Sequence, residues 1–132
     1  MLDLGLLIIR IVVGLLFVGH GAQKLFGWFG GHGLKGTAGW LESIGVKPGY
    51  TMAVFAAIAE FGGGLLFAAG LVTWLGAAAI IVTMLFAIVK VHGANGLWST
   101  AGGYEYNLVL IAVALGVAFT GAGAYSLDAL WF

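Results

Sequence analysis

The sequence predicts an all-α integral membrane protein, a four-transmembrane-helix antiparallel bundle with a short interfacial helix in its first loop. The first observation is composition, since 62% of the residues are apolar and only 8% are charged, whereas about a quarter of the residues in soluble domains are charged. The second is length, because about 20 apolar residues in a helix cross a bilayer core of about 30 Å. Four such stretches occupy roughly residues 4–26, 50–71, 74–92 and 104–121, and we expect a single membrane domain over 1–132.

The first span carries charges that a simple membrane anchor would avoid. Five of its residues follow steps of four, three, four and three, and so share one helical face: Arg10, Gly14, Phe17, Gly21 and Lys24. Charged side chains within a span usually face the protein interior or a wet cavity. We therefore expect this face to point into the bundle, and we interpret the stretch as a retained span rather than a cleaved signal peptide.

The loop from residue 32 to 49 is the longest polar stretch of the chain. Thr37, Trp40, Leu41 and Ile44 recur in it at helical spacing. This pattern predicts a short helix that lies on the membrane edge or dips into it.

The second span has a single charge, Glu60, near its middle. Small residues share its side of the helix at offsets of three, four and seven: Ala53, Ala56, Ala57, Gly63 and Gly64. A buried carboxylate must be paired, protonated or hydrated. Two interpretations stay open here. Glu60 is either a proton carrier or an anchor for a polar head group, or it forms a structural ion pair with Lys24 or Lys90 that fixes the helix register.

Small and polar faces also recur in the last two spans. The third has Gly76, Ala79, Thr83, Ala87 and Lys90, and the fourth has Asn107, Ala114, Ala118 and Gly121. Four spans place both termini on one side of the membrane and both polar loops on the other. The candidate residues for a polar, ligand-binding or proton-relay cavity then gather on the loop side: His20, Lys24, Glu60, Lys90, His92, Tyr104, Glu105 and Asn107.

Other features limit the function and the topology. The absence of cysteine excludes disulfides and thiolate chemistry, and a formal net charge of zero gives no reason to expect nucleic acid as a partner. The histidines and carboxylates are too scattered to predict a metal site. Arg10, on the terminal side, binds a lipid phosphate or has a structural role. The lysines on the loop side favour cytoplasmic loops with the termini outside.

Several stretches, in their order and spacing, resemble the DoxX family of small four-helix membrane proteins over nearly the whole chain. They are RIVVGLLFVGHG from Arg10, KLFG from Lys24, AEFGGGLL from Ala59, GYEYNL from Gly103, and the segment from Gly123 to Asp128. The resemblance implies a bacterial-type plasma (inner) membrane location. It also implies an association with quinone-linked oxidation or with membrane oxidoreductase complexes, with quinone as the candidate cofactor.

Three functions are consistent with the sequence. The first is a component that binds a quinone-like small molecule, or a partner subunit of a membrane oxidoreductase system whose other subunit is soluble or membrane-bound. The second is a channel or carrier for protons or a small solute. The third is a structural scaffold that docks a soluble redox enzyme. The sequence has no self-contained catalytic motif, so the chain is at most a subunit of a quinone-linked oxidoreductase, and a homo-oligomer is a further candidate assembly.

Overall fold

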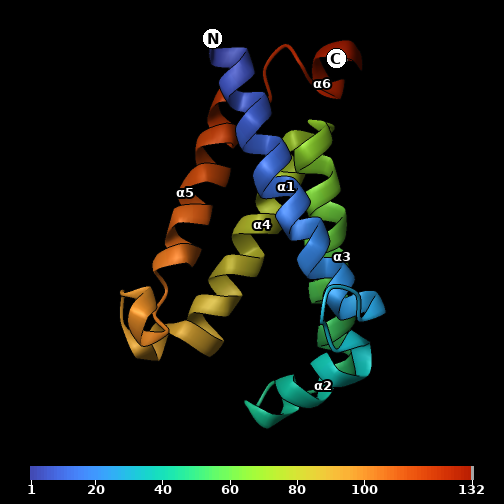
Figure 1. The fold of residues 1–132 in the computed structure, drawn as a ribbon, viewed down its shortest axis with the longest axis vertical. Coiled ribbons are helices and arrows are strands. Elements are labelled where there is room, and N and C mark those ends of the chain that lie inside the picture. Colours follow the sequence, from blue (N-terminus) through green and yellow to red (C-terminus); the bar gives the residue numbers. More distant parts are fainter. Residues whose placement is uncertain (132) are drawn as a thin grey trace.

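The computed structural model describes residues 1–131, and this part of the chain is helical without any strand. Its α-helices are α1 (Leu2–Phe26), α2 (Gly33–Ser43), α3 (Gly49–Ala69), α4 (Thr73–Ala87), α5 (Glu105–Thr120) and α6 (Leu127–Trp131). A π-helical turn, η1 (Ile88–His92), and two 3₁₀ turns, η2 (Gly93–Asn95) and η3 (Ser99–Ala101), connect α4 to α5. The start of α1 and α6 lie at one end of the molecule, and α2 and the α4–α5 connection lie at the other (Figure 1).

Three helical stretches are long and apolar enough to cross a membrane. They are Leu2–Phe26, Gly49–Ala69 and Thr73–Asn95, and α5 is a shorter apolar helix. The structure is therefore that of an all-helical integral membrane protein. The third stretch is α-helical only as far as Ala87, because its last turns widen into η1 and then tighten into η2.

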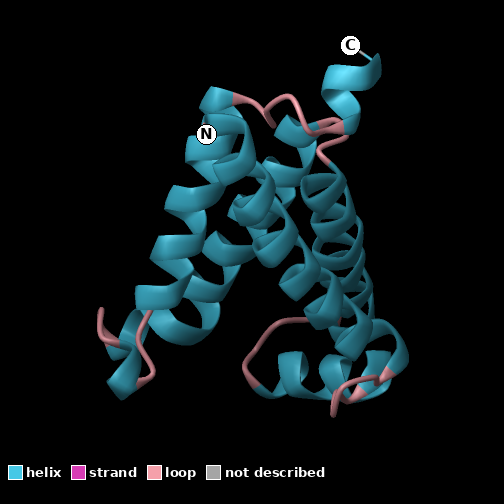
Figure 2. Cartoon of the chain, turned by 45° about the horizontal axis from the view of Figure 1, so that its top comes forward, coloured by secondary structure: helices cyan, strands magenta, loops and turns pink. Residues whose placement is uncertain are grey.

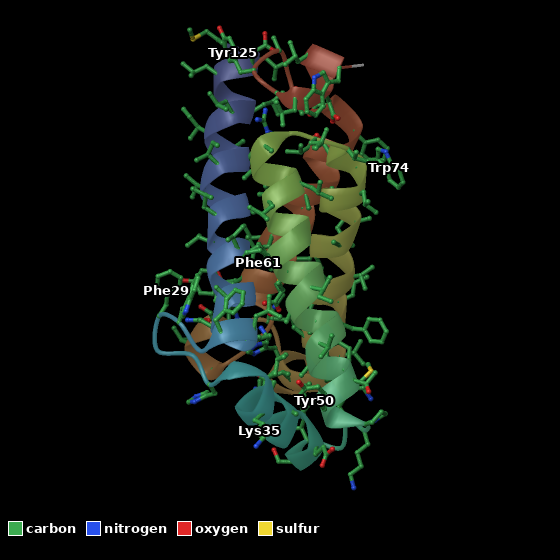
Figure 3. All side chains as sticks on the ribbon, turned by 90° about the vertical axis from the view of Figure 1, so that its right-hand side faces the viewer. Phe29, Lys35, Tyr50, Phe61, Trp74 and Tyr125 are labelled. Atoms are coloured by element: carbon green, nitrogen blue, oxygen red, sulfur yellow. The ribbon has the colours of Figure 1, made fainter. Side chains whose placement is uncertain are left out.

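Helices α1 and α3 make the most extensive contact in the structure. Glycines allow their backbones to touch: a Cβ atom on Gly21 would lie 2.5 Å from the backbone nitrogen of Phe61, and one on Gly64 would lie 2.6 Å from the carbonyl oxygen of Gly14. Figure 3 shows Phe61 where the two helices meet. Arg10, Gly14, Phe17 and Gly21 are all buried, which confirms that the face predicted for the first span points inward.

Helices α4 and α5 form a second pair, of which α4 packs against α3, and the two pairs share a core near the terminal end. The shared core lies there and consists of Leu6, Phe17, Phe67, Ala77, Ile80, Ala114 and Val117. Toward the loop end the two pairs diverge, and α2 packs beneath α1 and α3 (Figures 1 and 2). The loop end is therefore divided between two arms, one formed by α1, α2 and α3 and the other by α4, α5 and the turns that connect them.

This divergence corrects two faces that the sequence predicted. Ala118 and Gly121 of the fourth span are exposed, and Val117 packs in the core instead, because α5 has neighbours mainly on its α4 side. Lys90 is also exposed. It lies in the π turn, whose wider winding rotates the residues after Ala87 away from the face that α4 presents.

Candidate functional site

The end of α1 and the middle of α3 bring one ion pair together. Lys24 Nζ donates hydrogen bonds to Glu60 Oε1 at 2.9 Å and to Glu60 Oε2 at 2.7 Å. Glu60 is buried, with 6% of its surface exposed, whereas a quarter of the Lys24 side chain is exposed. The close approach of Gly21 to Phe61 places the next turn of α1 beside Glu60, so that the lysine can reach it. Of the two partners that the sequence left open for Glu60, the structure pairs it with Lys24.

A polar cavity of about 270 Å³ adjoins the Lys24 side of this pair. The end of α1, the glycine loop after it and the first turns of α2 line the cavity with Gln23, Lys24, Gly30, Gly31, His32, Gly36, Thr37 and Trp40. Gly27 ends α1 with a left-handed backbone (φ 74°), which lets the chain turn back beneath the helix. Lysine has three N–H donors and Glu60 takes two of them, so one donor of Lys24 remains for a molecule in the cavity.

A chain of hydrogen bonds runs beside the ion pair on α1. The His20 Nδ1 atom lies 3.2 Å from Gln23 Oε1, and Gln23 Nε2 donates to the carbonyl oxygen of Phe29 at 3.2 Å. His20 is exposed, and its ring meets Phe17 edge to face with the ring centroids 6.3 Å apart. Gln23 therefore connects His20 to the loop that closes the cavity.

The other candidate residues lie on the second arm. The His92 Nδ1 atom lies 2.8 Å from the carbonyl oxygen of Gly102, and Glu105 Oε1 accepts a hydrogen bond from the Ser99 backbone at 3.0 Å. Tyr104 is half-buried just before α5, and the buried Asn107 donates to Met84 Sδ at 3.4 Å. The structure thus brings together Lys24 and Glu60, with His20 one turn before Lys24, and it places Lys90, His92, Tyr104, Glu105 and Asn107 on the α4–α5 arm (Figure 1).

Of the residues that line the cavity, sequence reasoning included only Lys24 among the site candidates; the others with polar or aromatic side chains are Gln23, His32, Thr37 and Trp40. The helical spacing of Thr37 and Trp40 predicted a helix there, but not that α2 folds back beneath α1. The useful signal was the glycine-rich stretch after Lys24, because a reversal of the chain brings the following helix under the lysine.

Arg10 lies at the opposite end of the bundle and is 1% exposed. Its guanidinium donates to four backbone carbonyls, those of Phe67 and Ala68 at the end of α3 and those of Ala122 and Tyr125 in the C-terminal segment. Unsatisfied carbonyls at a helix end attract a cation. The geometry favours the structural alternative for Arg10, because its donors are directed to protein carbonyls and it is closed off from lipid.

Two aspartates attach the same C-terminal segment. Asp128 accepts hydrogen bonds from the backbone nitrogens of Val72 (2.6 Å) and Thr73 (3.0 Å) and from the Thr73 hydroxyl, at the start of α4. Asp3 accepts one from the backbone of Ala124 at 2.9 Å. Burial alone would raise the pKa of Asp128, but the hydrogen bonds from Thr73 and Val72 and the charge of Arg10 together hold that pKa below its usual value.

A second cavity, of about 280 Å³, lies between α3 and α4 and is lined by Met52, Phe55, Ala56, Ala59, Val82, Thr83 and Phe86. Its apolar lining suits hydrocarbon rather than a polar group. Within the described part of the chain, no three histidines, cysteines or carboxylates form a group that could hold a metal ion.

Comparison with known proteins identifies the family. Residues 5–93 match the DoxX family. The chain is 32% identical to Inner membrane protein YqjF of Escherichia coli (strain K12) over 97% of this chain and 92% of that protein. It is 30% identical to "Putative oxidoreductase CatD" of Bacillus subtilis (strain 168) over 98% of this chain and 89% of that protein. No solved structure gives a significant match. The chain therefore belongs to the DoxX family and is an integral inner-membrane protein.

Proposed function

We propose that this protein binds the polar head of a quinone-like molecule beside the Lys24–Glu60 pair, as a component of a membrane oxidoreductase system. The observation that carries the proposal is that Lys24, which pairs with the buried Glu60, also lines a polar cavity. The pair is neutral overall, so a neutral head group can accept a hydrogen bond from the remaining N–H of Lys24 without displacing Glu60. An anion would compete with Glu60 for the lysine and leave a buried carboxylate unpaired, which is costly.

The cavity lining fits a flat, neutral ring with carbonyl groups. Trp40 provides an aromatic surface on which such a ring can stack. Gln23 and Thr37 provide further polar groups at the edge of the cavity. The CatD relative, by its name, supports an oxidoreductase association, but the chain offers no catalytic motif of its own, and we propose that a partner subunit carries the redox chemistry.

The proposal includes a topology. We place α1, α3, the continuous stretch Thr73–Asn95 and α5 as four spans of a single domain, and α2 as an interfacial helix whose buried side (Ala38 and Leu41) faces α3. At about 1.5 Å per residue, α5 covers about 24 Å, which is close to the thickness of the bilayer core. Lys35, Lys47 and Lys90 are exposed near the loops and support cytoplasmic loops. This topology puts the polar cavity at the cytoplasmic membrane edge.

A binding titration tests the proposed function. The full-length protein in lipid nanodiscs is titrated with menadione, a small quinone, and the protein fluorescence is followed. We expect saturable binding to the wild type and to the control variant Lys90→Met. The double variant Lys24→Met/Glu60→Gln keeps the pair neutral but removes the donor, and we expect its affinity to fall about tenfold. Equal affinity of the double variant and the wild type, or no saturable binding by the wild type, would contradict the proposal.

The two rival functions give different results in the same preparation. A proton or solute channel would produce flux in liposomes that stops in Glu60→Gln, without quinone binding. A docking scaffold would retain a stoichiometric soluble enzyme through purification. The buried, doubly hydrogen-bonded state of Glu60 favours ligand binding over conduction, because a conducting carboxylate must exchange its partner repeatedly.

A further inference from the structure

The hydrogen bonds around Gln23 determine which ring nitrogen of His20 carries the proton. The carbonyl oxygen of Phe29 can only accept, so the Gln23 atom that faces it must be the donor Nε2. The other amide atom, Oε1, is then the one next to His20 Nδ1, and an amide oxygen can only accept. In the neutral ring, His20 Nδ1 must therefore carry the hydrogen, and Nε2 is the free acceptor.

The surrounding contacts hold this arrangement in place. A Cβ atom on Gly31 would lie 2.5 Å from Gln23 Cα, so the glycine loop packs directly on Gln23 and positions the Phe29 carbonyl. The ring of Phe17 lies edge to face with the His20 ring. His20 also lies four residues before Lys24 on α1, so the two side chains are neighbours on the helix surface.

We propose that His20 Nε2 accepts a hydrogen bond from the ligand, and that the site therefore recognises the reduced, hydroxyl-bearing form of the ring, a hydroquinone or a related phenol. This inference rests on the proposed function for the identity of the ligand, but not for the state of His20. Lys24 is a donor and fits any ring oxygen, whether carbonyl or hydroxyl. The His20 acceptor fits only a hydroxyl, because a quinone carbonyl has no hydrogen to donate. Gln23 lines the cavity and also positions the His20 ring through its hydrogen bond to Nδ1.

Nitrogen NMR tests the state of His20 without any ligand. The full-length protein is labelled with ¹⁵N-histidine in nanodiscs at a pH where the rings are neutral, and the three histidines are assigned by single substitutions. We expect Nδ1–H for His20, and also for His92, whose Nδ1 faces a carbonyl oxygen. Gln23→Leu should remove the preference for Nδ1–H in His20 and leave His92 unchanged. Gln23→Glu, which keeps an acceptor, should preserve Nδ1–H in His20. A wild-type His20 protonated at Nε2, or a Gln23→Leu protein with His20 unchanged, would overturn the inference.

Paired titrations test the ligand. Menadiol and menadione are compared under anaerobic conditions with the wild type, His20→Phe and Gln23→Leu. We expect both variants to lower the affinity for menadiol about fivefold more than they lower the affinity for menadione, the effect of one lost hydrogen bond. Equal weakening for both ligands, or none for menadiol, overturns the inference and leaves the proposed function standing. If the wild type binds neither, the proposed function fails together with this ligand assignment, whatever the state of His20.

Discussion

Replacing Lys24 with methionine leaves the Glu60 carboxylate without the ammonium group that donates to both of its oxygens. Removing one partner of a buried pair costs about 3–5 kcal/mol. Because a quarter of the Lys24 side chain is exposed, water reaches this end of the pair, and we expect about 3 kcal/mol. Glu60→Gln keeps an oxygen that accepts from Lys24, so we expect a loss of about 1–2 kcal/mol. The double variant should lose less than the sum, with a coupling of about 1–3 kcal/mol.

The assay is the free energy of unfolding in mixed micelles, measured for the wild type, both single variants and the double variant. Lys90→Met is the matched control, because Lys90 is an exposed lysine of the other arm. It should change the free energy by less than about 0.5 kcal/mol and should be additive with Glu60→Gln. Additivity between Lys24→Met and Glu60→Gln, or a coupling between Lys90 and Glu60, would refute the pairing.

Three further predictions concern the packing of the bundle. Arg10→Lys cannot reach all four carbonyls with one compact ammonium group, so limited proteolysis should cleave the C-terminal segment faster than in the wild type; equal rates would count against this role. Because the folded pKa of Asp128 is lowered, its stabilising effect should be complete above the unfolded pKa of about 4 and be lost as the pH falls through the folded value. Unfolding measurements against pH should show this slope flattened in Asp128→Asn, and an unchanged slope would argue against it. Gly21→Ala should destabilise by about 1–3 kcal/mol, since its Cβ would overlap the Phe61 backbone; a neutral result in the same micelle assay would contradict the close helix contact.

The periodicity of the sequence predicted which faces of α1 and α3 are buried. Arg10, Gly14, Phe17 and Gly21 follow the helical repeat, and each is buried as expected. The depth of Glu60 in its span predicted that it needs a partner. The choice of Lys24 depended on how closely α1 approaches α3, which Gly21 allows but does not reveal by spacing alone.

Contacts between distant parts of the chain could not be predicted from local patterns. Asp3 binds a backbone group 121 residues away, and Arg10 binds carbonyls 57 to 115 residues away. No helical repeat encodes such pairs. The separation of the α4–α5 arm is a similar case, since it depends on the tertiary packing of α5 and removes Lys90, His92 and Glu105 from the neighbourhood of Glu60.

A native mass spectrum of protein gently extracted from its membrane tests the central claim most directly, because it shows what the cavity holds before any ligand is added. The wild type should carry a bound molecule whose fragments include a quinone or hydroquinone ring. The double variant Lys24→Met/Glu60→Gln should lack this molecule while retaining the same bound lipids. A wild-type spectrum with lipid alone, or the same quinone bound equally to the double variant, would contradict a quinone-like site at Lys24 and Glu60.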